Sequence, residues 1–122
     1  MAFIKSTSTL SSNAVVVPNL SGGTNGRVVR ISGSNTCVDA DNSDTSTQLQ
    51  TLLFKIGDQY YAAGVVSGLS GLSPGIPYYL STSGQIISAP PTPTASRRVV
   101  FIGFSINTTD IIFRPGTPIS GT

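Results

Sequence analysis

The stretch that decides the fold is Leu49–Val66, which reads LQTLLFKIGDQYYAAGVV. Two runs rich in aliphatic, aromatic and β-branched residues, Leu49–Ile56 and Gln59–Val66, are separated only by Gly57-Asp58. A two-residue connection of this kind is typical of a tight β-hairpin, in which the glycine takes a positive φ. This stretch therefore predicts two antiparallel strands joined by a turn at Gly57.

The hairpin pattern continues on both sides of this stretch. Turn residues separate further strand-like runs at short intervals, and this spacing is typical of an all-β sandwich or small barrel. Within the strongest run, alternation places Val100, Ile102, Phe104 and Ile106 on one face and Val99 and Phe101 on the other. Apolar residues on both faces predict a central strand, or one that gives a face to a neighbouring subunit. The predicted strands are Arg27–Ser32, Thr36–Ala40, Tyr78–Thr82 (joined by Ser83-Gly84 to the next), Gln85–Ser88, Arg98–Ile106 and Asp110–Phe113.

The composition of the 122 residues agrees with a β fold and excludes several function classes. The chain has 18 serines and 14 threonines, and charged residues make up only 10%. It contains no glutamate, histidine or tryptophan, which argues against a helical bundle and excludes a Ser-His-Asp triad or a histidine metal site. We therefore expect a protein that is not an enzyme and has no cofactor or bound metal.

The first 25 residues differ from the rest because they are polar and carry a single apolar island, Ala14–Val17. Such a segment is typical of an extended N-terminal arm that finds its partner on another surface, or of a first strand of the domain itself. We predict an arm over residues 1–25, a β-domain over 26–116 and a C-terminal tail over 117–122. The predicted partner-binding residues of the arm are Phe3, Ile4, Val15, Val16 and Val17.

One enzymatic pattern occurs, because Gly71-Leu72-Ser73-Pro74-Gly75 fits the G-x-S-x-G elbow of α/β-hydrolases. The residue after the serine must offer a backbone N–H to an oxyanion, and Pro74 has none. No histidine is present to accept the serine proton. We interpret the segment as a type II turn with Pro74 and Gly75 at its centre.

Two weaker patterns suggest ligands. The run Asp39–Asp44 resembles part of a calcium loop, but it lacks the glycine and glutamate that an EF-hand requires, so a solvated polar loop is the default. The pairs Tyr60-Tyr61 and Tyr78-Tyr79 could form a sugar-binding surface. Alternation along a strand instead turns one tyrosine of each pair inward, where it contributes to the core.

The net charge of +2 comes from few charges rather than from a basic cluster, so we expect no nucleic acid as partner. The lone Cys37 is expected to be a small apolar residue. The longest apolar runs have four residues, which predicts no membrane partner. The start, Met1–Lys5, is not typical of a secretory signal, so we expect synthesis in a reducing cytoplasm.

A resemblance narrows the function. The turn Gly68-Leu69-Ser70-Gly71-Leu72-Ser73-Pro74-Gly75, the strand Tyr78-Tyr79-Leu80-Ser81 and the Gly84 turn resemble a pattern of bacteriophage virion proteins. The connector at Pro90-Pro91 is similar to the proline-rich connector of that pattern. The likeness continues through Val99–Ser105 and Thr109–Pro115, and upstream through Gly26–Val29 and Val38–Asp41, so that it covers about residues 26–116.

This resemblance implies a fold and a virion context, and it brings no catalytic residue. Such domains occur as capsid decoration (cement) proteins and as parts of tail fibres, tail tips and baseplates. We expect a decoration protein on the outer capsid surface that bridges major capsid subunits, made in the host cytoplasm and assembled as a homo-oligomer, a trimer being our expectation. The alternatives are a tail or baseplate component, which could bind host-surface carbohydrate, and a free carbohydrate-binding module.

Overall fold

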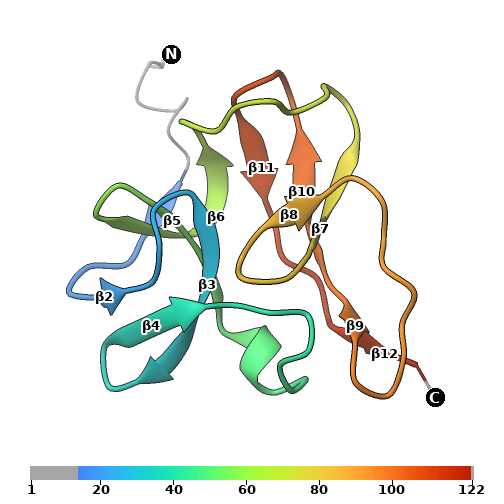
Figure 1. Ribbon diagram of the computed structural model, residues 1–122. Coiled ribbons are helices and arrows are strands. Elements are labelled where there is room, and N and C mark those ends of the chain that lie inside the picture. Colours follow the sequence, from blue (N-terminus) through green and yellow to red (C-terminus); the bar gives the residue numbers. More distant parts are fainter. Residues whose placement is uncertain (1–13, 122) are drawn as a thin grey trace, which may run out of the picture.

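The computed structural model describes residues 14–121, and it confirms the all-β prediction (Figure 1). One turn of 3-10 helix, Gln48–Gln50, accompanies the strands in this part of the chain. The strands are β1 (Val15–Val16), β2 (Ser21–Gly22), β3 (Arg27–Gly33), β4 (Thr36–Asp39), β5 (Leu52–Ile56), β6 (Gln59–Val66), β7 (Pro77–Leu80), β8 (Ile86–Ile87), β9 (Arg98–Val99), β10 (Phe101–Ser105), β11 (Ile111–Phe113) and β12 (Ile119–Ser120).

Most strands belong to one continuous ladder in the order β2-β4-β3-β5-β6-β11-β10-β7-β8, and β1 pairs with β6 beside this path. The ladder folds over at β6, whose first half pairs with β5 and whose last residues, Gly64–Val66, pair with β11. Two sheets that share β6 are thereby packed in a sandwich-like arrangement. The first sheet holds β1 to β6, and the second holds β6, β7, β8, β10 and β11 (Figure 1).

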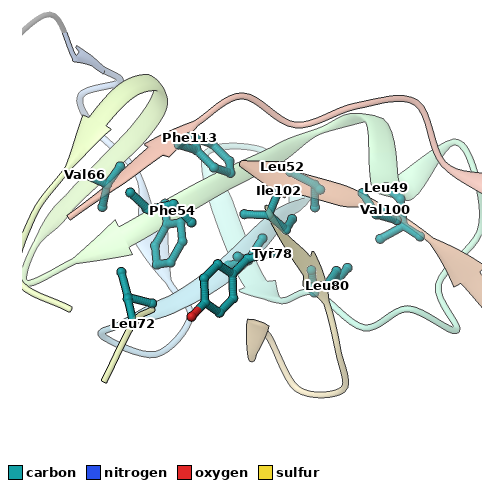
Figure 2. Packing of buried hydrophobic residues seen from close by; sticks show 13 residues of the cluster. Leu49, Leu52, Phe54, Val66, Leu72, Tyr78, Leu80, Val100, Ile102 and Phe113 are labelled. Carbon is teal, nitrogen blue, oxygen red and sulfur yellow. The ribbon is translucent and has the colours of Figure 1, made fainter. Parts of the chain in front are cut away.

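The main core lies between the two sheets. Phe54 of β5 and Phe113 of β11 meet there edge to face, with ring centroids 5.6 Å apart. Each large side chain removed from water contributes about 1.5–3 kcal/mol as an upper estimate, so this cluster is the main source of stability. Figure 2 shows its packing; the buried members are Val28, Ala40, Leu49, Leu52, Phe54, Val66, Leu72, Tyr78, Leu80, Val100, Ile102, Ile111 and Phe113.

The turn between β7 and β8 joins the far end of the second sheet to the first sheet. The Val28 N–H donates to the Gly84 carbonyl at 2.8 Å, and the Gly84 N–H donates to the Ala40 carbonyl at 2.5 Å. The Ala40 N–H in turn donates to the Val28 carbonyl at 2.9 Å. The two bonds of Gly84 join the sheets, and the third lies within the first sheet; we call the three bonds together the Gly84 junction, which closes the sandwich on one side.

The N-terminal residues of the described chain form part of the domain. Residues 14–25, which we call the strap, pair with β6 through β1 and with β4 through β2, and thus reach both edges of the first sheet. Between these edges Val17 and Leu20 pack on a second buried cluster on the outer side of that sheet, made by Val29, Cys37, Leu53 and Tyr60. Of the two interpretations of the apolar island, the structure therefore shows a strand of the chain's own domain.

Polar contacts fix the strap to the sheet. The Tyr60 hydroxyl donates to the Gly22 carbonyl at 2.7 Å, and the Lys55 ammonium donates to the same oxygen at 3.1 Å. Thr24 donates to both carboxylate oxygens of Asp39, from its N–H at 2.8 Å and from its hydroxyl at 2.7 Å. The polar groups of Tyr60, Lys55 and Asp39 therefore serve contacts within the domain.

The run Arg98–Ile106 is not one regular strand, which corrects the predicted face. A register irregularity lies between Phe101 and Gly103. Because of it, Ile102 is fully buried in the main core, while Phe104 is half-buried and Ile106 is 46% exposed. Alternation alone could not place this irregularity.

The start of the predicted strand Leu49–Ile56 and the predicted C-terminal tail also differ from the expectation. Leu49 lies in the 3-10 turn instead of in β5, because Thr45 and Gln48 exchange side-chain and backbone hydrogen bonds of 2.9 and 3.2 Å. Within the predicted tail, Ile119–Ser120 forms β12 and pairs with β9. The turn at Gly57 has the predicted positive φ, 59°.

A glycine pair tests the Gly84 junction. Gly84 and Gly57 have left-handed φ values of 74° and 59°, but a Cβ on Gly84 would lie 2.6 Å from the Val28 carbonyl oxygen, whereas a Cβ on Gly57 meets nothing within 4 Å. Gly57→Ala should cost about 1–2 kcal/mol for the backbone alone. Gly84→Ala should cost about 1–3 kcal/mol more because of the clash. Urea denaturation of both variants measures this, and equal losses would contradict the role of the junction.

Candidate interaction surface

The predicted partner-binding residues that the structure describes lie in β1. Val15 and Val16 are 55% and 43% exposed, which is unusual for valines in a strand, while Val17 is half-buried against the second cluster. Phe3 and Ile4 lie outside the described residues. The structure thus brings Val15 and Val16 together at an exposed strand edge and assigns Val17 to packing within the domain.

The edge at β1 has the properties of a docking strand. Val16 is the register partner of Tyr61, whose other neighbour is Phe54 of β5, so β1 is the outermost strand beside this part of β6, and β11 pairs only with the end of β6. Within residues 14–121, no strand other than β6 pairs with β1. A short apolar edge strand of this kind can accept or join a strand of another chain.

Other exposed apolar side chains are separated from this edge. Within residues 14–121, the other large exposed apolar side chains occur singly on four segments, and single exposed apolar residues are ordinary on protein surfaces. Val15 and Val16 are adjacent, which makes the β1 edge the strongest apolar candidate. The scattered residues are Ile31, Val38, Ile106 and Ile119.

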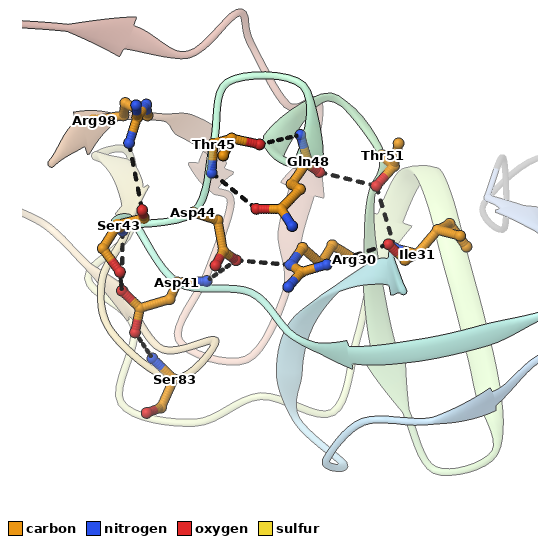
Figure 3. Close-up of polar contacts among 10 residues, drawn as sticks. All are labelled: Arg30, Ile31, Asp41, Ser43, Asp44, Thr45, Gln48, Thr51, Ser83 and Arg98. Carbon is orange, nitrogen blue, oxygen red and sulfur yellow. Dashed lines mark hydrogen bonds and ion pairs between the residues drawn. The ribbon is translucent and has the colours of Figure 1, made fainter. Parts of the chain in front are cut away.

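The acidic loop that resembles a calcium site is a hydrogen-bonded structural element (Figure 3). One Asp41 carboxylate oxygen accepts from the Ser43 N–H and hydroxyl at 3.0 and 2.8 Å, and the other accepts from the Ser83 N–H at 3.1 Å. Asp44 pairs with Arg30 at 2.9 Å. Since N–H and O–H groups already point at these oxygens, the loop is arranged to join β3 to the β7–β8 turn.

The pKa of Asp41 shows the same balance of contacts. Partial burial raises its pKa, but the hydrogen bonds from Ser43 and Ser83, together with the charge of Arg97, lower it more, so that the pKa lies below its ordinary value. The folded state therefore favours the ionised carboxylate.

No group of three or more metal-ligating side chains is present within residues 14–121.

The G-x-S-x-G segment is a turn held against β10. The Ser73 N–H donates to the Tyr78 hydroxyl at 2.8 Å, and the Ser73 carbonyl accepts from the Ser105 hydroxyl. Gly75 has φ 77°, as a type II turn requires, and its N–H donates to the Ser105 carbonyl at 2.8 Å. The geometry agrees with the turn interpretation.

The tyrosine pairs do not form a joint sugar platform. Tyr78 is buried in the main core, whereas Tyr60 is buried in the second cluster beneath the strap, on the other face of its sheet. Tyr61 packs against the main core from β6, and Tyr79 of β7 contacts Phe101 edge to face at 6.1 Å. Strands β11 and β10 lie between β6 and β7, so the two half-exposed rings have different surroundings.

The cations and the cysteine are also engaged locally. Arg98 donates to the Ser46 hydroxyl and the Ser43 carbonyl at 3.3 and 3.4 Å, and Arg114 lies over the Phe104 ring at 5.7 Å. Cys37 is only 3% exposed, and burial raises the pKa of its thiol although the nearby Lys55 lowers it.

None of the helical residues described forms a span long and apolar enough to cross a membrane.

The surface has two hollows that the sequence does not predict. The larger, of about 550 Å³, lies between the start of β3, strand β8 and residues 68–72, and the smaller, of about 360 Å³, lies between the 3-10 turn and residues 115–117. Each is lined by segments far apart in the chain. No local pattern of residues could have indicated them.

Comparisons with protein-family models, with curated proteins and with solved structures found no match to this chain.

The Asp41 contacts generate a stability prediction. Asp41→Asn replaces an acceptor by an amide that cannot accept on both sides, which should cost about 1–3 kcal/mol at neutral pH. Because the folded pKa is below the ordinary value, this stabilisation is present above a pH of about 4 and is lost as the pH falls through the folded pKa. Urea denaturation at pH 7 and at decreasing pH measures the difference.

The control for this prediction is Asp58→Asn, at an exposed position in the β5–β6 turn. The stability difference between wild type and Asp41→Asn should shrink in acid, while Asp58→Asn should stay close to wild type throughout. A constant Asp41→Asn deficit at every pH would contradict the assigned contacts.

Proposed function

We propose that this chain is a structural protein of a phage virion, a decoration protein that binds the outer surface of the capsid. The observation that carries the proposal is the exposed apolar edge of β1, which stands out on a domain whose other features are structural. The resemblance of residues 26–116 to virion β-domains supports the same context.

The mechanism is mechanical rather than chemical. A small domain with only 10% charged residues can bury a large surface against neighbours with little cost of desolvating ions. Each copy would bridge adjacent major capsid subunits, and many weak contacts would add through multivalency. A closed oligomer, for which we propose a trimer, would match a symmetry axis of the shell.

The β1 edge tests this proposal. The double variant Val15→Thr/Val16→Thr keeps β-branched residues but places hydroxyls on the docking edge. Replacing a methyl group by a hydroxyl at two buried interface positions should weaken binding at least about tenfold. Co-sedimentation with purified capsids of the virus that encodes this chain, prepared without it, measures the bound copies per particle.

Val38→Thr provides the matched control, because Val38 is 40% exposed on β4, away from β1. It should bind like wild type, and all variants should show the wild-type unfolding midpoint. Undiminished capsid binding by the double variant would overturn the role of the β1 edge. If wild-type protein bound only to tails, as seen by labelled-antibody microscopy, the protein would be a tail component.

A further inference from the structure

The larger hollow is a crevice at the open end of the sandwich, where β3 and β8 move apart. Its volume of about 550 Å³ lies within the range of ligand pockets. Leu72 and Tyr78, both 7% exposed members of the main core, contribute to its lining, and Leu69 and Ile86 add further apolar surface. Its polar groups are the side chains of Arg27, Ser70 and Gln85 and the hydroxyl of Tyr78.

The crevice lies next to the hydrogen bond between Val28 and Gly84. At the Gly84 junction the β7–β8 turn bonds to Val28, but the next residues of β8 separate from the start of β3, where Gly26 and Arg27 line the crevice. The two segments that frame the hollow are therefore two strand edges, aligned at one end by hydrogen bonds and open at the other.

The peptide groups of Ile86 face this opening. Its register partner Leu80 donates its N–H to the Val100 carbonyl at 3.0 Å, and the Leu80 carbonyl accepts from the Asn42 amide at 3.5 Å, so both peptide groups of Leu80 point away from β8. The Leu80–Ile86 pair is thus of the non-hydrogen-bonded type, in which the Ile86 N–H and C=O point outward. Outside the strand ladders, no backbone hydrogen bond within residues 14–121 engages them.

The charge of the crevice is positive. Among the described residues that line it, Arg27 is the only charged one, and none is an aspartate. One guanidinium nitrogen of Arg27 donates to the Ser83 carbonyl at 2.7 Å, which holds the side chain and leaves its other N–H groups for a carboxylate.

We propose that the crevice binds an extended peptide strand of a partner protein, one that carries an aspartate or glutamate between β-branched residues. The strand would add to β8 through the Ile86 peptide groups, place an apolar side chain against Leu69 and Leu72, and pair its carboxylate with Arg27. The start of a second copy fits less well, because Lys5 is the only charged side chain of residues 1–13 and Arg27 would repel it. This inference does not depend on the proposed virion function.

Three synthetic peptides test the proposal by NMR titration of the full ¹⁵N-labelled chain. The acidic peptide is acetyl-Thr-Val-Asp-Val-Thr-amide, the second has lysine in place of aspartate, and the third is the acidic peptide methylated on alternate backbone nitrogens. The acidic peptide should give saturable shifts at Arg27, Leu69, Ile86 and Ile87. Both other peptides should bind at least about tenfold more weakly than the acidic peptide.

Two protein variants complete the test. Arg27→Gln should weaken the acidic peptide about tenfold and should strengthen the lysine peptide, because it removes a like charge. Arg97→Gln, at an exposed arginine outside the crevice, should behave like wild type with both peptides. Amide spectra of both variants report whether the fold is intact.

Absence of saturable shifts at millimolar acidic peptide would overturn the proposal. Equal binding of the methylated peptide would exclude strand addition, and equal binding of the lysine peptide would exclude the role of Arg27. Capsid co-sedimentation of Arg27→Gln reports separately on the proposed function, since that function is assigned to the β1 edge.

Discussion

The structure depends on the three backbone hydrogen bonds of the Gly84 junction. Apart from them, the second sheet meets the first through β6, through the side chains of the core, and through hydrogen bonds of Asp41 and Asn42 to residues 80–83. The requirement is steric as well as polar, because a side chain at Gly84 would lie against the Val28 carbonyl and the Arg27 Cβ. The acidic loop reinforces the same place, since Asp41 binds Ser83 next to the junction.

A second constraint concerns the outer side of the first sheet. Antiparallel sheets often leave one face to water, but this sheet places Val29, Leu53 and Tyr60 on its outer face and covers them with the strap. Two of the few cations make contacts within the domain. Lys55 donates a hydrogen bond to the strap, and Arg30 forms an ion pair with the acidic loop. Few charged groups remain for the surface, and this explains how a charge-poor chain still has specific internal contacts.

The sequence predicts what local rules govern and misses what distant contacts govern. The β5–β6 hairpin, the Gly57 turn and the Pro74-Gly75 turn follow from backbone preferences within a few residues, and the structure agrees. The irregularity beside Gly103, the pairing of β12 with β9 and the strap's place on the sheet depend on partners far along the chain. Of the candidate residues, Val15 and Val16 were recognisable as an apolar island, whereas the crevice at Ile86 has no local signal.

The position of Cys37 gives the molecule its own reporter. It is the only cysteine of the chain, it lies in the cluster beneath the strap, and Gly22 of the strap is its register partner. A thiol in this position reacts with a reagent only after the strap separates from the sheet or the domain unfolds. The rate at which Cys37 of the unmodified protein reacts therefore reports the free energy needed to separate the strap from the sheet. A partner that binds across β1 would slow this reaction.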